Sequence, residues 1–173
     1  MNKFNPNLKI DGYNCRRKII VLKEYKGNLQ EFADEVFSSK MTSNKVKNLG
    51  EIDENIIIDM NKKGININSN EIFITDKIIL KYLNHPKSKK GAGINLKRFS
   101  EIEKMILNPK NIFEDITSES PMYVYTFDYD EKIIKAMVQP NYKIAGNLIN
   151  LLKSIGIIDE IRMANPTQYR ILK

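Results

Sequence analysis

The sequence predicts an α+β fold in which helices pack on one face of a small antiparallel β-sheet. Three observations lead to this prediction. Helix-type spacing of apolar residues is prominent before residue 110, and short β-branched or aromatic runs dominate after it. Between them, residues 75–109 hold the single histidine, a glycine-rich basic loop and two helix patterns. We therefore look for function in that stretch.

The first part of the chain predicts a strand at residues 18–22 and then a helix. Asn28 is a suitable helix cap, because Glu31 follows three residues later. The apolar residues of this helix fall on one face and are Leu29, Phe32, Ala33, Val36 and Phe37. Residues 40–49 predict a loop or a frayed helix.

Two strands, residues 55–60 and 71–75, are expected to form a hairpin around the turn-prone residues 61–64. A helix then starts at Thr75 and Asp76 and stops before Pro86. A second helix is expected from Asn95. Its predicted buried residues are Leu96, Phe99, Ile102, Ile106 and Leu107.

After Pro109 the pattern favours strands. Residues 122–127 and 133–138 predict an antiparallel hairpin with its turn at residues 128–131. Residues 147–158 fit a short helix and a strand equally well, since periodicity does not distinguish them. Two short strand-like pieces, residues 161–163 and 169–172, close the chain.

The composition indicates a globular chain with an anionic partner. Its 173 residues suit one domain, or one domain with an N-terminal extension, and 28 basic against 21 acidic residues give a net charge of +7. Lysine, isoleucine and asparagine are abundant throughout, so the base composition of the gene offers a second explanation for part of this charge. We expect a nucleic-acid or anionic-surface partner.

Several chemistries are excluded by residue counts and motifs. The single Cys15 has no partner for an internal disulfide, and the chain lacks the second histidine of a Cys/His zinc site. No P-loop and no G-x-S-x-G motif occur. The acidic pairs Asp53–Glu54 and Asp128–Asp130 fit solvated turns better than a two-metal nuclease. We expect no metal and no cofactor, no membrane segment, and a cytoplasmic location.

A basic cluster surrounds the lone histidine. No acidic residue occurs between Asp76 and Glu101, whereas seven lysines and arginines do. His85 stands at a predicted helix end, where it can exchange a proton near neutral pH or act as a structural cap. The predicted nucleic-acid contacts here are Lys87, Lys89, Lys90, Lys97 and Arg98. A merely solvated charged loop is the alternative.

The motifs NHP at residues 84–86 and NP-x-x-I at residues 108–112, followed by a predicted sheet, resemble phage-borne nucleases of the barnase–EndoU–colicin–RelE superfamily. The resemblance covers about residues 70–173. It divides the chain into an N-terminal α/β extension, residues 1–66, which is either separate or part of the same domain, and a nuclease-type domain, residues 67–173. It implies a metal-independent ribonuclease of a phage or mobile element, used as a toxin or effector.

The same resemblance assigns roles to residues. His85 matches the leading histidine of the family, and the polar groups on the late strands correspond loosely to Arg162, Thr167, Tyr169 and Arg170. The implied reaction is transesterification within RNA, in which His85 moves the proton, lysines and Arg162 hold the phosphate, and Tyr169 stacks on a base or donates a proton. Arg170 is a further predicted nucleic-acid contact. Besides RNA, the implied partner is a host protein or a cognate inhibitor.

Two other functions remain open at this point. A non-enzymatic phage or mobile-element protein could use the same basic surface to bind nucleic acid or inhibit a host nucleoprotein. A structural protein of a larger assembly would instead use the N-terminal part, and it predicts an exposed apolar patch at Phe32, Val36 and Phe37.

Overall fold

The computed structural model describes residues 21–84, 99–129 and 132–173, in which the strands form one mixed sheet. These strands are β1 (Lys23–Glu24), β2 (Lys45–Glu51), β3 (Glu71–Thr75), β4 (Asn111–Asp115), β5 (Tyr123–Tyr129), β6 (Lys132–Ile144), β7 (Asn147–Ile158) and β8 (Tyr169–Ile171). Their order is β1-β2-β3-β7-β6-β5-β4-β8, with parallel pairs β1–β2 and β3–β7 and antiparallel pairs elsewhere. The prediction of a small antiparallel sheet is therefore wrong, since the sheet has 8 strands and two parallel pairings.

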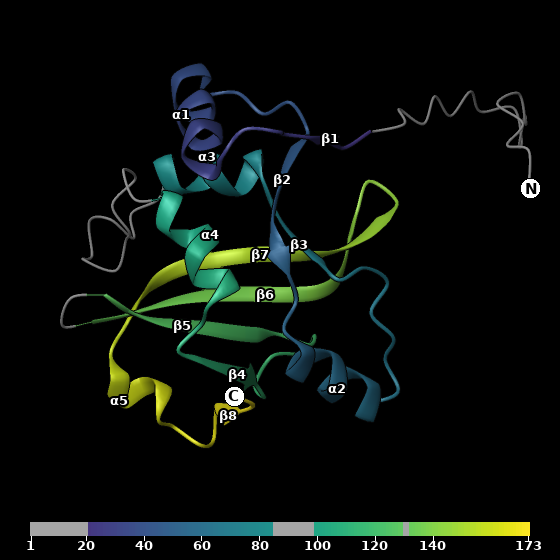
Figure 1. Cartoon of the computed structure of the whole chain (residues 1–173), viewed down its shortest axis with the longest axis vertical. Coiled ribbons are helices and arrows are strands. Elements are labelled where there is room, and N and C mark those ends of the chain that lie inside the picture. Colours follow the sequence, from purple (N-terminus) through teal and green to yellow (C-terminus); the bar gives the residue numbers. More distant parts are fainter. Residues whose placement is uncertain (1–20, 85–98, 130–131) are drawn as a thin grey trace, which may run out of the picture.

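The helices are α1 (Leu29–Ser39), α2 (Glu54–Lys62), α3 (Asp76–Asn84), α4 (Phe99–Leu107) and α5 (Glu160–Met163). Figure 1 shows α1 and α3 at one end of the molecule and α5 with β8 at the other. On β5, Tyr123 and Tyr125 belong to the main core together with residues of α1 to α4, whereas Val124 packs with Met163 of α5 and Tyr169. Successive side chains on a strand point to opposite faces. The helices thus lie on both faces, which corrects the expectation of one covered face.

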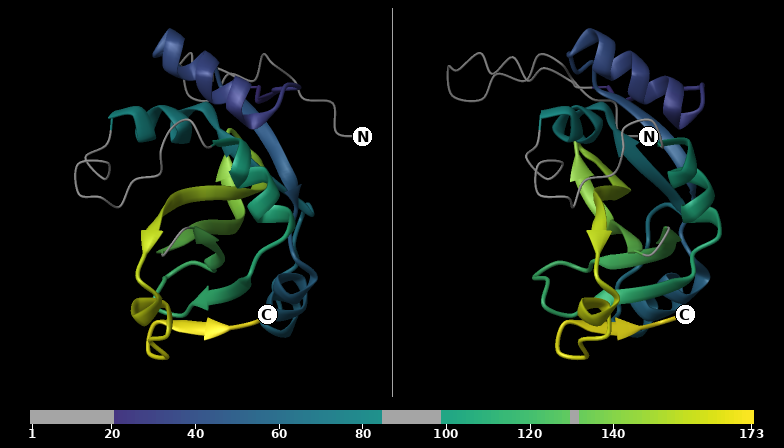
Figure 2. Two further views of the ribbon diagram at one scale, coloured as in Figure 1. Left: turned by 60° about the vertical axis from the view of Figure 1, so that its left-hand side comes forward. Right: turned by 90° about the vertical axis from the view of Figure 1, so that its left-hand side faces the viewer.

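The sheet is strongly twisted, so the strands at its two ends run in different directions. Figures 1 and 2 show that β2 runs in a clearly different direction from β5 and β6. As a result, β7 is paired with β3 only at Asn150 and Leu151, while its pairing with β6 extends to Ile158. Among the described residues, no strand covers the rest of that edge of β7.

Several predicted elements are confirmed. Asn28 caps α1: its side chain accepts a hydrogen bond from the backbone N–H of Glu31, and the Glu31 carboxylate accepts one from the Asn28 N–H, at 2.9 and 3.0 Å. The strand at residues 71–75 is β3, and α3 follows it directly. The hairpin after residue 121 is β5 paired antiparallel with β6. Within its predicted turn, Asp128 lies in β5, and residues 130 and 131 are outside the described ranges.

Residues 55–60 are a helix, so the predicted strand and its hairpin are wrong. The Asp53 side chain accepts a hydrogen bond from the Asn55 N–H at 2.9 Å and so caps α2. Ile56 and Met60, four residues apart, are both buried, while Ile58 is exposed. The apolar run satisfies both periodicities, and the cap selects the helix.

Other expectations also need correction. The loop predicted at residues 40–49 contains the start of β2, residues 161–163 belong to α5, and residues 147–158 form the strand β7. Strands therefore precede residue 110 and a helix follows it. Residues 21 and 22 are outside any strand, and the rest of the predicted strand at residues 18–22 lies outside the described part. Residues 169–171 do form the expected strand, as β8.

Helix α4 buries most of its predicted face. Phe99, Ile102 and Ile106 are buried, Leu107 is exposed instead, and Leu96 lies outside the described residues. Gly50 lets α4 approach β2: it has a φ of +130°, and a Cβ there would stand 2.7 Å from Leu107. The proposed apolar patch on α1 is absent from the surface, because Phe32 and Val36 are buried and Phe37 packs against the core.

Candidate nucleic-acid interface

The predicted basic segment, residues 85–98, lies outside the described residues, but both of its attachment points are described. Helix α3 ends at Asn84 and α4 begins at Phe99. This segment contains His85 and the predicted contacts Lys87, Lys89, Lys90, Lys97 and Arg98. Figures 1 and 2 place the two attachment points on the same side of the molecule as the end of β7 and α5.

Aromatic contacts fix the junction between α3 and α4. The rings of Tyr82 and Phe99 meet edge to face, with their centroids 6.1 Å apart, and Phe37 meets Phe99 in the same way at 5.8 Å. The backbone N–H of Phe99 donates to the Gln30 side-chain oxygen at 3.1 Å. Contacts among α1, α3 and α4 thus fix the places where the chain enters and leaves residues 85–98.

The Tyr82 hydroxyl also bonds the edge of β7 that no described strand covers. Its hydroxyl donates to the carbonyl of Ile155 at 2.9 Å and accepts the N–H of the same residue. Burial raises the pKa of Tyr82, so the phenol stays protonated at neutral pH. The hydroxyl therefore replaces the hydrogen bonds of a missing neighbouring strand at Ile155.

Charge is divided unevenly between the described and the remaining residues. Within the described ranges, lysines and arginines are as numerous as aspartates and glutamates, so that part of the chain is neutral. The sequence of residues 85–98 contains five basic and no acidic residues. Residues 1–20 add a second basic group, Lys3, Lys9, Arg16, Arg17 and Lys18. The net charge of +7 therefore belongs to segments attached to a neutral body.

A groove, which we call the α4–β5 groove, lies between α4 and the end of β5. It has a volume of about 560 Å³, and its lining residues are Glu101, Lys104, Met105, Asn108, Pro109, Lys110, Phe127 and Asp128. Glu101, Lys104 and Met105 of α4 and Asn108 directly after it are spaced at i, i+3, i+4 and i+7, which is one face of a helix. This face lies beside the buried one that carries Phe99, Ile102 and Ile106. The groove starts only three residues after Arg98.

Ion pairing in the α4–β5 groove is incomplete. Lys110 donates to Asp128 at 2.8 Å, and this hydrogen bond raises the pKa of Lys110. Lys104 and the side chain of Asn108 make no ion pair or hydrogen bond with another described residue. Both are exposed. The groove therefore offers one ammonium group and one amide group for an external ligand.

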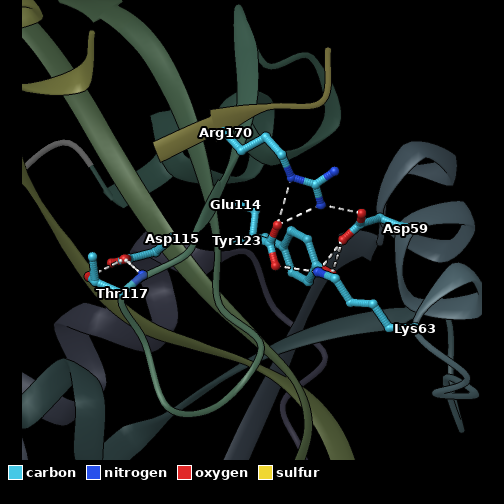
Figure 3. A network of polar contacts seen from close by, with 7 residues as sticks. All are labelled: Asp59, Lys63, Glu114, Asp115, Thr117, Tyr123 and Arg170. Atoms are coloured by element: carbon cyan, nitrogen blue, oxygen red, sulfur yellow. Dashed lines mark hydrogen bonds and ion pairs between the residues drawn. The ribbon is translucent and has the colours of Figure 1, made fainter. Parts of the chain in front are cut away.

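Arg170, a predicted nucleic-acid contact, is held in a closed network that we call the Asp59 clamp: Asp59, Lys63, Glu114, Tyr123 and Arg170 (Figure 3). Its guanidinium donates to Glu114, from Nε at 2.9 Å, and to Asp59. Lys63 bonds the same two carboxylates, at 2.6 Å to Asp59. The Tyr123 hydroxyl donates to Asp59 at 2.8 Å. The Arg170 side chain is still 50% exposed, but its Nε and Nη2 already donate to these carboxylates.

The electrostatics of the Asp59 clamp favour the charged carboxylate. Burial alone would raise the pKa of Asp59, but hydrogen bonds from Lys63, Tyr123 and Arg170 together lower it below its ordinary 3.8. Burial and the hydrogen bond to Asp59 raise the pKa of Tyr123. The clamp joins α2, β4, β5 and the C-terminal strand β8, so these charges hold the end of the chain in place.

The remaining late-strand residues are not assembled into one site. Tyr169 is buried and its ring packs against Phe113, with centroids 6.3 Å apart, so it is not placed to stack on a base. Thr167 donates to its neighbour Asn165 at 2.8 Å. Arg162 is exposed on α5, and its nearest carboxylate, that of Asp159, is 3.9 Å away. Of the four late-strand predictions, Arg162 alone presents a charge to solvent without a close partner in the described part.

The prediction from sequence missed the α4–β5 groove. The signal was present, because the polar positions of α4 recur with helical spacing and Pro109 with Lys110 follows directly. The pairing of Lys110 with Asp128 could not be predicted, since it depends on β4 pairing with β5.

Two further findings concern the described residues, and a third concerns the whole chain. No helix among them is long and apolar enough to cross a bilayer. No group of three or more His, Cys, Asp or Glu side chains among them is arranged to hold a metal ion. Comparison with family models, curated proteins and solved structures found nothing that matches this chain.

Proposed function

We propose that the protein binds RNA, and that residues 85–98 supply the main contact. The observation that carries this proposal is the division of charge: the described body is neutral, and residues 85–98 contain only basic charges. Binding of a polyanion gains free energy from counterions released by lysine and arginine. A neutral body adds no comparable attraction, and residues 1–20 contain one acidic residue beside their five basic ones, so residues 85–98 have the larger net positive charge of the two basic groups.

The fixed α3–α4 junction supports this role. Tyr82, Phe99 and Gln30 anchor the two ends of the segment on the helical layer. The described contacts thus fix the residues at which the chain enters and leaves the segment. The end of α3 and the start of α4 lie on the side of the molecule that holds the end of β7 and α5 (Figure 1).

The test is a comparison of two triple variants with the same loss of charge. In the segment variant, Lys87, Lys89 and Lys90 become alanine. In the body variant, Lys62, Lys77 and Lys143 become alanine; these three are exposed and make no ion pair with another described residue. We expect the segment variant to bind a labelled single-stranded RNA at least about tenfold more weakly than the body variant. Equal affinities, or no RNA binding by the unmodified protein, would contradict the proposal.

Metal-independent cleavage of the bound RNA is the second candidate function. The observation that favours it is the α4–β5 groove, which brings together Glu101 and Lys104 of α4, the helix that follows the His85 segment, with Lys110 from the connection between α4 and β4. In this reaction the 2′-oxygen forms a bond to the neighbouring phosphorus, and the bond between that phosphorus and the 5′-oxygen of the next nucleotide breaks. His85 would take or return the proton, and the lysines would stabilise the charge on the phosphate.

Cleavage is tested with purified protein in EDTA, scored by the appearance of 2′,3′-cyclic phosphate ends. We expect His85→Ala to lower the rate by about 10²–10⁴-fold, while RNA affinity and the thermal midpoint stay unchanged. A lack of cyclic phosphate products from the unmodified protein would remove this candidate, and so would full activity in the variant. Neither result bears on RNA binding itself.

A further inference from the structure

We propose that the α4–β5 groove holds one nucleotide of the bound RNA strand, with the phosphate at Lys104 and Lys110 and the base against Met105. This inference rests on the proposed RNA binding and adds a second contact outside the basic segment. The groove has the size of a small-ligand site, about 560 Å³. Its first lining residue, Glu101, follows the basic segment by three positions in the sequence.

The two lysines suit a phosphate. Lys104 has no ion-pair partner among the described residues, and it is exposed on the groove side of α4. Lys110 is paired with Asp128, but this pair is exposed, with side-chain accessibilities of 46% and 64%. An exposed pair contributes little to stability, so Lys110 can exchange its carboxylate for a phosphate at low cost.

The apolar lining suits a nucleobase. Met105 is half buried, and Phe127 belongs to the core below it. A flat base can cover the half-buried Met105 thioether, which removes apolar surface from water. The Asn108 side-chain amide beside it makes no hydrogen bond with another described residue, and an amide can both donate to and accept from the edge of an unpaired base.

The groove should distinguish single-stranded from double-stranded RNA. In a duplex the bases are stacked and paired, so none can lie on Met105. Only a phosphate contact would remain. The charges of the lining also balance, two lysines against Glu101 and Asp128, so attraction for phosphate alone is weak. The groove therefore adds affinity for an unpaired nucleotide rather than for RNA in general.

The experiment uses the full chain and a labelled single-stranded RNA of about 12 nucleotides. The groove variant is Lys104→Glu with Lys110→Glu. Its control is Lys62→Glu with Lys143→Glu, which makes the same charge change at exposed positions on α2 and β6. Melting curves first establish that both variants are folded. We expect the groove variant to bind at least about tenfold more weakly than the control, with a smaller difference on duplex RNA.

A photo-crosslink locates the base directly. The same RNA carrying 4-thiouridine is crosslinked to the unmodified protein, and the tryptic peptides are sequenced by mass spectrometry. We expect crosslinks on the peptide spanning residues 105–110. Crosslinks confined to other peptides, together with equal affinities of the groove variant and the control, would overturn the groove contact and leave RNA binding intact. If the unmodified protein bound no RNA, both proposals would fail together.

Discussion

The Asp59 clamp and the α4–β5 groove contain similar side chains in different surroundings. In the clamp, the carboxylates of Asp59 and Glu114 are only 7% and 13% exposed, and each bonds both Lys63 and Arg170. In the groove, Asp128 is 64% exposed, and its one described ion pair is with Lys110. The cations are similarly exposed, Arg170 at 50% and Lys110 at 46%, so the difference lies in the carboxylates. Buried carboxylates with two cations each hold the fold, whereas an exposed carboxylate with one cation leaves that cation available for a ligand. Burial and the number of partners, not residue type, separate the two roles.

The largest effect on stability should come from breaking the clamp. Asp59→Ala leaves Lys63 and Arg170 without their most buried partner, and the Tyr123 hydroxyl without an acceptor. Lys63 and Arg170 are 32% and 50% exposed and both keep Glu114 as a partner, so the loss should be about 2–3 kcal/mol in the free energy of unfolding. Urea denaturation measures this loss. Asp128→Ala is the matched control in the groove, and it should leave the urea midpoint nearly unchanged. Similar losses of unfolding free energy in Asp59→Ala and Asp128→Ala would contradict the claim that the clamp, and not the groove, stabilises the fold.

A smaller effect is expected from one hydroxyl in the clamp. Tyr123→Phe removes the hydrogen bond to the charged Asp59 but keeps the buried ring. We expect a loss of about 1.5 kcal/mol, measured by urea denaturation. Tyr125→Phe on the same strand is the comparison, because its hydroxyl is also buried but accepts from the neutral N–H of Asp53 at 3.1 Å. A larger loss of unfolding free energy in Tyr125→Phe than in Tyr123→Phe would contradict the view that the charge of Asp59 strengthens its hydrogen bond with Tyr123.

The clamp should also make stability depend on acid pH. Since the pKa of Asp59 is lower in the folded state, the unfolded chain binds this proton more tightly. The stabilisation is therefore complete above the ordinary pKa of 3.8 and is lost as the pH falls through the folded value. Thermal midpoints measured across this range should fall less steeply in Asp59→Asn than in the unmodified protein. Parallel curves for the two proteins would contradict this assignment.

Local signals predicted individual elements better than their assembly. The capping box at Asn28 and Glu31, the strand at residues 71–75 and the hairpin after residue 121 depend on neighbours in sequence, and all three are confirmed. The run at residues 55–60 was wrong because its isoleucines fit two periodicities, and the cap at Asp53 decides between them. Competing periodicities make such short apolar runs ambiguous.

The sheet could not be predicted, because its size depends on pairings between distant residues. Strand β3 lies beside β7, and β4 lies beside β8. The candidate site shows the same limit. The basic residues 85–98 are evident in the sequence, but the pairing of Arg170 with Asp59 brings together residues far apart in the chain. Sequence therefore identified the charges but not which of them the fold neutralises.

The salt dependence of RNA binding tests most directly whether the functional charge resides in residues 85–98. Affinity is measured over a range of salt concentrations for the unmodified protein, the Lys87, Lys89 and Lys90 alanine variant, and the Lys62, Lys77 and Lys143 alanine variant. For a single strand, each lost phosphate contact reduces the logarithmic salt slope by about 0.7. We predict that the segment variant loses about 2 from the slope and that the body variant keeps the slope of the unmodified protein. An unchanged slope in the segment variant, or an equal reduction in both, would contradict the account.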